Sequence, residues 1–387
     1  MPHLRGLTWR HRRGTSPLRA SAAAYTRQQP DTTIEWDDLP WHEFWQLSIQ
    51  EMSRHSGRYD LYMFDHPWVG DFVENGWLVP LDNFLSTQQR ADLSADADPA
   101  SYRSYVWQER TWALPVDAAC HVIPFRPDLA ESETLPSDWD ALLTFARTRH
   151  RPPDRYAFAV PWGGGNALLF FLAVLAATGE PAFEEPANAR ITPERGRRAL
   201  DIVRQVWELS LPLEQMGGRR GIYELLSETD KAVLGASVFA YINYFGPHAT
   251  HPLSIADVPV LPESGVRTSM LGGMGLGISV DCPDPRRAWE YAWFVMSKPV
   301  QGGIYVENQG QPARLSALRD PVVQARTGPF CPVLLRALDG CYVRPRYPRW
   351  LEIENGAAPT LERFLQGAAT PDETLKTLEA RAALLAL

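Results

Sequence analysis

The sequence predicts an α/β fold, and three observations carry that prediction. Short apolar strands alternate with helical segments over residues 4–76, a pattern typical of a parallel sheet with helices on both faces. The chain of 387 residues can bury a substantial core and is long enough for two domains. Hydrophobic residues at 45% and charged residues at 22% fit an ordinary soluble globular protein.

Three strands and three helices are expected in the N-terminal part. The strands are LRGLTW (4–9), TTIEWDDL (32–39) and YDLYMFD (59–65). The helices that follow them are expected at 16–30, 41–57 and 67–76. Ser16 is a favoured N-cap and Pro17 suits the first helical position, so we expect the first helix to begin there. Gly76 is expected to end the third helix.

The rest of the chain continues the alternation. Later strands are expected at 113–117, 121–125, 155–162, 237–245, 256–262 and 272–280. Later helices are expected at 136–149, 166–179, 192–211, 285–298 and 370–387. The apolar segment 166–179 is expected to be a buried helix. Ala288, Tyr291 and Val295 have the spacing of one buried helix face.

Composition argues against two classes of partner. The net charge is −8 and no basic stripe stands out, which argues against nucleic-acid binding. No run of 18 apolar residues occurs, so no membrane span is expected.

Neither a metal nor a cofactor is expected. Cys120, Cys282, Cys331 and Cys341 show no C-x-x-C spacing, so a zinc knuckle or thioredoxin-like motif is not expected. Cys331 and Cys341 could form a disulfide in an oxidising compartment. The segment GGMGLG lacks the last glycine of a dinucleotide-binding loop, because position 278 is isoleucine.

The first residues carry no signal-peptide pattern. They contain neither an apolar core of 7–15 residues nor a small-residue cleavage site. The expectation is a cytoplasmic protein as the sequence stands, or an extracytoplasmic one if a leader was removed.

Candidate ligand-binding residues follow the first and third expected strands. Ligand sites in such sheets lie beyond the carboxyl ends of the strands, which points to Trp9, Arg10, Asp65, His66 and Trp68. Fourteen tryptophans are many for this length, and indole rings stack on the apolar faces of sugars. Core packing is the alternative for each tryptophan, and helix capping is the alternative for Asp65.

Two later segments add candidates. In PWGGGN, Trp162 is favoured for stacking, with Gly164 and Asn166 in a loop that lets the backbone approach a ligand. Asn243 and Tyr244 lie in an expected strand, where side chains alternate, so at most one should face a ligand.

Five segments occur in an order that resembles the family 1 extracellular solute-binding proteins, the carbohydrate-binding subunits of ABC importers. They are YDLYMFDHPWVGDFVENGWLVPLDNFL, WALPVDAACHVIPFRPDLA, LPSDWDALLTFAR, GGMGLGISVDCPDPRRAWEYAWFVMS and ENQGQPARLSALRDP. The resemblance extends from about residue 4 to the last helix.

The resemblance implies a two-lobe periplasmic-binding-protein fold of class II type, with a hinge and a ligand cleft between the lobes. It places one lobe at 1–115 plus about 250–310, and the other at about 116–249 plus 311–387. The expected function is capture of a sugar or similar polar small molecule by hinge closure. A monomer that docks on an ABC permease is implied.

The resemblance also implies site residues. Asp117 lies at the expected hinge, where it either faces ligand or makes a hinge hydrogen bond. Gly273 and Met274 belong to a glycine-rich strand whose backbone approaches either the ligand or the other lobe. Arg314 matches a segment near the cleft, with a surface position as its alternative.

Two other functions remain open at this point. Thiaminase I has a similar two-lobe architecture and a cysteine nucleophile in the cleft, which would make Cys120 catalytic in a cytoplasmic enzyme. A thiolate beside Asp117 would be disfavoured by like charge, and a small buried thiol is the alternative. A cytoplasmic ligand sensor would share the binding mechanism and differ in its partner.

Overall fold

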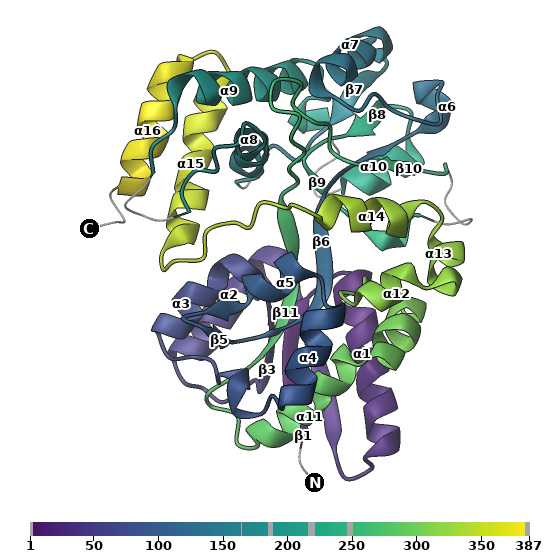
Figure 1. The fold of residues 1–387 in the computed structure, drawn as a ribbon, viewed down its shortest axis with the longest axis vertical. Coiled ribbons are helices and arrows are strands. Elements are labelled where there is room, and N and C mark those ends of the chain that lie inside the picture. Colours follow the sequence, from purple (N-terminus) through teal and green to yellow (C-terminus); the bar gives the residue numbers. More distant parts are fainter. Residues whose placement is uncertain (1–2, 164, 185–188, 216–220, 246–250, 384–387) are drawn as a thin grey trace. The chain divides into compact units, whose positions relative to one another are not determined.

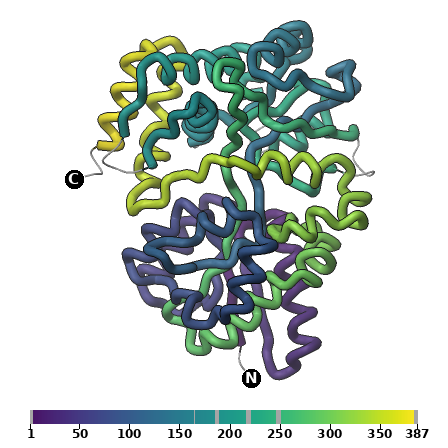
Figure 2. The backbone as a smooth tube through the Cα atoms, in the orientation of Figure 1, coloured from purple at the N-terminus to yellow at the C-terminus, as the bar shows by residue number. Residues whose placement is uncertain are grey.

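The computed structural model describes residues 3–163, 165–184, 189–215, 221–245 and 251–383 (Figure 1). The chain divides into two compact units. Unit 1 consists of Met1–Ala119, Tyr241–Asn243 and Gly272–Thr327, and unit 2 of Cys120–Ala240, Tyr244–Leu271 and Gly328–Leu387. The chain thus changes unit after Ala119, Ala240, Asn243, Leu271 and Thr327. Figure 2 traces these segments by colour along the backbone.

Unit 1 contains four strands of the sheet, the first part of a fifth, and a separate two-stranded hairpin. Its strands are β1 (His3–Trp9), β2 (Thr33–Leu39), β3 (Leu61–Phe64), β4 (Val106–Trp107), β5 (Arg110–Thr111), the start of β6 (Leu114–Phe125), and β11 (Leu271–Ile278). Its helices are α1 (Arg12–Gln28), α2 (Trp41–Ser53), η1 (His66–Trp68), α3 (Val69–Glu74), η2 (Leu81–Asn83), α4 (Thr87–Asp96), α5 (Pro99–Ser104), α11 (Pro285–Met296), η5 (Val300–Tyr305), α12 (Leu315–Arg319) and α13 (Pro321–Thr327).

The sheet of unit 1 has the order β2-β1-β3-β11. Strand β1 pairs in parallel with both β2 and β3, as the alternation of strands and helices predicted. Strand β11 pairs with β3 in the antiparallel direction, so the sheet is mixed. The expected buried face of α11 is confirmed, because Ala288, Tyr291, Ala292 and Val295 are all inaccessible to solvent.

Helix α1 begins four residues before the predicted Ser16. The N-cap is His11, whose Nδ1 accepts the backbone N–H of Arg13 at 3.1 Å. Pro17 therefore lies inside the helix and not at its first position. The prediction was wrong because an imidazole can satisfy a helix N-terminus as a hydroxyl does.

Strand β6 is one continuous strand of 12 buried residues, where two separate strands were expected. It continues into unit 2 after Ala119. The other strands of unit 2 are β7 (Tyr156–Ala159), β8 (Ala232–Gly235), β9 (Val238–Phe239) and β10 (Ser254–Ala256). Strands β8, β9 and β10 pair with β6, and β7 pairs in parallel with β8.

Helices form most of the remainder of unit 2. They are α6 (Pro127–Ala130), α7 (Trp139–Arg149), α8 (Asn166–Ala177), α9 (Pro193–Glu208), η3 (Leu213–Gln215), α10 (Ile222–Glu228), α14 (Phe330–Leu338), α15 (Trp350–Leu365) and α16 (Pro371–Ala383). Helix α8 packs against α9 and α15, and α16 packs against both of these (Figure 1). The apolar helix is buried as predicted, from Ala167 to Ala177.

Two predicted strands do not form as expected. The segment 256–262 overlaps β10 only at Ala256, and 237–245 is not a continuous strand. The segment 237–245 forms only the short β9 and then η4 (Ile242–Tyr244). The backbone N–H of Ile242 donates to the side-chain Oε1 of Gln311 at 3.0 Å, and not to a neighbouring strand. The Gln311 side chain thus accepts the hydrogen bond that a neighbouring strand would otherwise accept from this backbone N–H.

No helix within the described ranges is long and apolar enough to cross a bilayer. The structure records no disulfide bond among the described residues, so the one considered between Cys331 and Cys341 is not formed.

Candidate ligand-binding site

The carboxyl ends of β1, β2 and β3 lie at one edge of the sheet in unit 1. Trp9, at the end of β1, is opposite Leu39, at the end of β2. Beyond these ends the chain continues into Arg10, Trp41 and Asp65. Ligands of sheets with parallel strands bind at this edge, so we take it as the candidate site.

Tryptophans from three segments contact one another at this edge. The ring centroid of Trp41 lies 6.5 Å from that of Trp9 and 5.8 Å from that of Trp68. Trp45 also contacts Trp68, at 6.5 Å. Trp9 and Trp68 are 6% and 3% exposed, whereas Trp41 is 48% exposed. The buried indoles therefore support Trp41, whose ring is available for stacking on an apolar face.

Sequence reasoning did not single out Trp41. It treated this residue only as the start of a helix, and α2 does begin there. Its position directly after the second expected strand was the available signal. The rule that ligands bind beyond the carboxyl ends of strands covers that strand as well as the first and third. Trp9 and Trp68 are core residues of unit 1, the alternative stated for them.

Hydrogen-bonding groups lie beside the tryptophans. Arg10 donates through Nε to Asp38 Oδ1 at 3.4 Å and through Nη2 to the Asp38 carbonyl at 3.0 Å. Thr15 Oγ1 donates to Asp38 Oδ2 at 3.0 Å. The side chain of Arg10 is 58% exposed, so its planar donors can reach a polar ligand.

Arg13 and Asp117 form a buried ion pair close to the same edge. Arg13 Nε donates to Asp117 Oδ2 at 2.7 Å, and Arg13 Nη2 donates to Asp117 Oδ1. The side chains are only 4% and 0% exposed. Burial alone would lower the pKa of Arg13, but the charge and hydrogen bonds of Asp117 raise it above its ordinary value. Asp117 is thus paired with Arg13 inside unit 1, close to the point where the chain passes into unit 2.

The two sequence segments that join the units are tied together within unit 1. The guanidinium of Arg13 lies 4.5 Å from the ring centroid of Tyr241. Gln311 Nε2 donates to the carbonyl of Ala118, while its Oε1 accepts from Ile242. Arg13 and Gln311 thus each bridge residues 117–118 to residues 241–242.

Asp65 and His66 follow β3 but are largely withdrawn from solvent. They are 8% and 0% exposed, and their closest side-chain atoms, Oδ1 and Nδ1, are 3.2 Å apart. Asp65 occupies the N-cap position of η1, yet its side chain makes no capping hydrogen bond. The side chain of Asp65 is 11% exposed and that of His66 only 1%, so neither is open to solvent as Trp41 is.

Gly273 and Met274 contribute to packing in unit 1. Gly273 has φ +108°, and a Cβ there would collide with the carbonyl oxygen of Asp117. The backbone of β11 thus approaches β6 closely, which explains the glycine without a ligand. Met274 is 4% exposed.

Arg314 is in the interior of unit 1 and not at its surface. Its side chain is 1% exposed, its Nη2 lies 2.7 Å from Asp92 Oδ2, and its Nε donates to the carbonyl of Met296 at 2.8 Å. These contacts join α4 to α11, so they give Arg314 a structural role.

Asn243 and Tyr244 do not alternate along a strand, because both lie in η4. Asn243, in unit 1, donates through Nδ2 to the carbonyl of Gln309 at 2.7 Å. Tyr244, in unit 2, donates through its hydroxyl to Glu224 and stacks on Tyr223 at 4.7 Å.

Trp162 packs inside unit 2. Its ring centroid lies 5.2 Å from Trp207 and 6.1 Å from Phe170, and it is 4% exposed. The structure therefore gives Trp162 the core position that was its alternative. Asn166 donates through Nδ2 to the carbonyl of Gly163 at 2.5 Å, and the candidate Gly164 lies outside the described residues.

Cys120 is buried in β6 and is 0% exposed. A cysteine nucleophile needs an accessible thiolate, so this position fits the alternative of a small buried thiol. In the part of the chain that the structure describes, no three His, Cys, Asp or Glu side chains are grouped as a metal site would require.

Comparisons with known proteins agree with this architecture. Residues 9–302 match the family model described as bacterial extracellular solute-binding protein. A protein of Brucella abortus (strain 2308), named as a binding protein, is 20% identical over 375 residues, covering 93% of this chain and 87% of its own length.

Solved structures share the whole fold. Maltose-bound MalE3 of T. maritima is 19% identical, covers 100% of both chains and has a TM-score of 0.84. An ABC transporter solute-binding protein of Agrobacterium radiobacter K84 in complex with ribitol is 21% identical, covers 99% of this chain and 98% of its own, and has a TM-score of 0.80. The fold is thus the two-lobe α/β fold of these proteins.

Proposed function

Because this chain belongs to the bacterial extracellular solute-binding protein family, we propose that it captures a sugar or polyol at the carboxyl edge of β1, β2 and β3. Ligand binding is coupled to hinge motion about the segments that connect the units. The proposed partner is an ABC permease, and the protein acts as a monomer.

The observation that carries this proposal is the exposed ring of Trp41. A flat, accessible indole ring is suited to stack on the apolar C–H faces of sugars and polyols. The exposed guanidinium of Arg10, held by Asp38, supplies planar donors for hydroxyl groups. The solved relatives with maltose and with ribitol support the same ligand class.

The contacts of the connecting segments support the hinge. Arg13 and Gln311 hold residues 117–118 and 241–242 inside unit 1. These fixed points leave the short stretches beyond them to absorb the backbone rotation, as hinges do.

A thermal-shift screen tests the proposal. Maltose, ribitol, D-mannitol and D-tagatose are each added at about 1–10 mM, which is about 1,000- to 10,000-fold above a micromolar Kd. At least one of them should raise Tm by several degrees. Leucine at the same concentration serves as a control. No shift with any sugar or polyol, in a panel widened to di- and trisaccharides, would contradict the assigned ligand class.

A further inference from the structure

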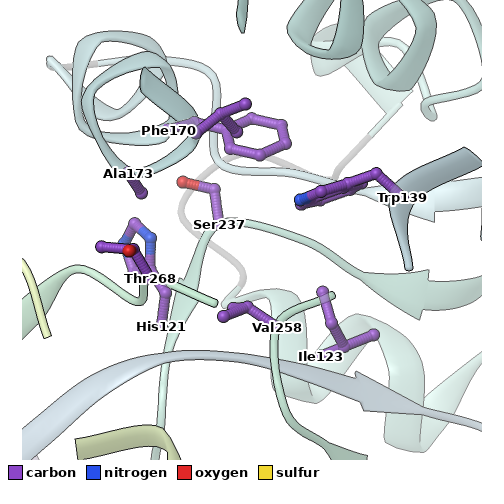
Figure 3. A pocket seen from close by; sticks show the side chains of 9 residues that line it. His121, Ile123, Trp139, Phe170, Ala173, Ser237, Val258 and Thr268 are labelled. Carbon is purple, nitrogen blue, oxygen red and sulfur yellow. The ribbon is translucent and has the colours of Figure 1, made fainter. Parts of the chain in front are cut away.

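Unit 2 contains a small pocket that the strand-end site does not use (Figure 3). Its wall is mostly apolar and includes Phe170 and Ala173 of α8. Trp139, at the start of α7, closes another side. Its polar part consists of His121 on β6, Ser237, and Thr268. All of these residues belong to unit 2.

Two buried polar atoms of this pocket find no hydrogen-bond partner among the described residues. They are Nε2 of His121 and Oγ of Ser237. The two residues are only 2% and 4% exposed. Buried polar groups in folded proteins are nearly always hydrogen-bonded to protein or to ordered water, so this pair calls for a partner that the chain does not supply.

The backbone conformation is defined at both residues. The His121 N–H donates to Met270 at 3.0 Å, and its carbonyl accepts from Ser269 Oγ at 2.7 Å. Ser237 has φ +52°, in the left-handed region, which is unusual for a residue with a side chain. These features define the backbone from which both side chains reach the pocket.

The imidazole is uncharged at neutral pH. Burial, and secondly the charge of Arg344, lower the pKa of His121 to about 3. A neutral imidazole offers one donor and one acceptor, so either ring nitrogen can bond to a neutral polar molecule. A hydroxyl such as that of Ser237 can likewise donate or accept.

We propose that this pocket binds one ordered water molecule, which hydrogen-bonds to His121 Nε2 and Ser237 Oγ. The pocket volume, about 10 Å³, matches the space that one water requires. A water also needs two to four polar partners. Figure 3 shows the indole nitrogen of Trp139 on the side of its ring that faces Ser237.

The water joins two chain segments near the points where they leave unit 2. His121 lies just after the change of unit at Ala119/Cys120, and Ser237 lies just before the change at Ala240/Tyr241. Strand β9 already pairs with β6 through His121 and Phe239. The water adds a side-chain link to this short pairing and stabilises the left-handed backbone of Ser237.

A crystal structure at about 1.5 Å resolution tests the proposal directly. A water should lie about 2.7–3.2 Å from both His121 Nε2 and Ser237 Oγ, at full occupancy and with a low B-factor. An empty pocket, or a direct hydrogen bond between the two side chains, would overturn it.

Magnetic relaxation dispersion of water nuclei gives an independent count in solution. Ser237→Ala should reduce the number of long-lived internal waters by one. Ser210→Ala is the matched control, because Ser210 Oγ donates to the carbonyl of Val206 and needs no water. An unchanged count in Ser237→Ala would contradict the proposal. If this variant does not fold, the crystal structure of the unmodified protein decides the question.

Discussion

The buried carboxylate of Asp117 accepts two hydrogen bonds from the guanidinium of Arg13, so α1 is tied to β6 at its passage from unit 1 to unit 2. The pair also explains why a helix begins with two arginines, which its own dipole disfavours. The charge of Arg13 is compensated by Asp117 and not by the helix.

Breaking this pair on one side should be severe. Asp117→Ala leaves the guanidinium buried and uncompensated, so we expect a loss of about 3–5 kcal/mol in the free energy of unfolding. Urea unfolding followed by circular dichroism measures it. The double variant Arg13→Met/Asp117→Leu removes both charges and should recover most of the loss. Equal losses in the single and double variants would show that packing, and not charge, dominates at this position.

His11 should make the protein less stable in mild acid. Burial, followed by the charges of Arg13 and Arg12, lowers its pKa from about 6.5 to about 4. The unfolded chain therefore binds a proton below about pH 6.5 that the folded chain binds only near pH 4. Stability should fall as the pH drops through this window and stay constant above it.

The variant His11→Asn isolates that effect. Asparagine caps a helix without titrating, so the stability of this variant should change less between pH 7 and pH 5, by about 1–2 kcal/mol. Urea unfolding of both proteins at the two pH values gives the comparison. His121 is present in both proteins, so its contribution is the same in each. Identical pH dependence would therefore mean that His11 is not the titrating group.

Gln311 should control local opening of the second connecting segment. Gln311→Met leaves the carbonyl of Ala118 and the N–H of Ile242 buried without their partner, at a cost of about 1–3 kcal/mol for each group. Hydrogen exchange of the Ile242 amide should then become faster by about tenfold or more. The amide of Leu4 in the central strand β1 serves as a reference, and equal acceleration at both amides would indicate general destabilisation instead.

The tryptophans at the strand ends should separate into a buried and an exposed class. Trp68→Ala removes a ring that is 3% exposed, so we expect a loss of about 3–5 kcal/mol in unfolding free energy. Trp41→Ala removes a half-exposed ring and should cost under about 1 kcal/mol. Thermal unfolding of the two variants distinguishes them, and a large loss for Trp41→Ala would make Trp41 a core residue.

Periodicity predicted most elements, because the buried faces of α8 and α11 and the parallel strands β1–β3 follow from local patterns. The start of α1 was misplaced, since the His11 cap depends on one side-chain geometry. Trp162 and Arg314 were expected near ligand, but packing partners distant in sequence, such as Trp207 and Asp92, bury them. Such partners leave no local signal.

Trp41 shows the converse case. The rule for strand ends was sufficient to find it, but its exposure depends on Trp9 and Trp68 filling the space beneath it. Sequence order gives the edge of the sheet, whereas which of several indoles remains accessible is decided by packing.

The central claim is tested most directly by isothermal titration of the protein and of Trp41→Ala with one ligand. That ligand is maltose or ribitol, whichever raises Tm more in the ligand screen. Trp107→Ala is the control, because this partly exposed indole of unit 1 lies in the separate β4–β5 hairpin. The account predicts one site with a Kd of about 1 μM, or −8 kcal/mol, weakened about tenfold or more in Trp41→Ala and unchanged in Trp107→Ala. Unaltered affinity in Trp41→Ala would contradict the assigned site.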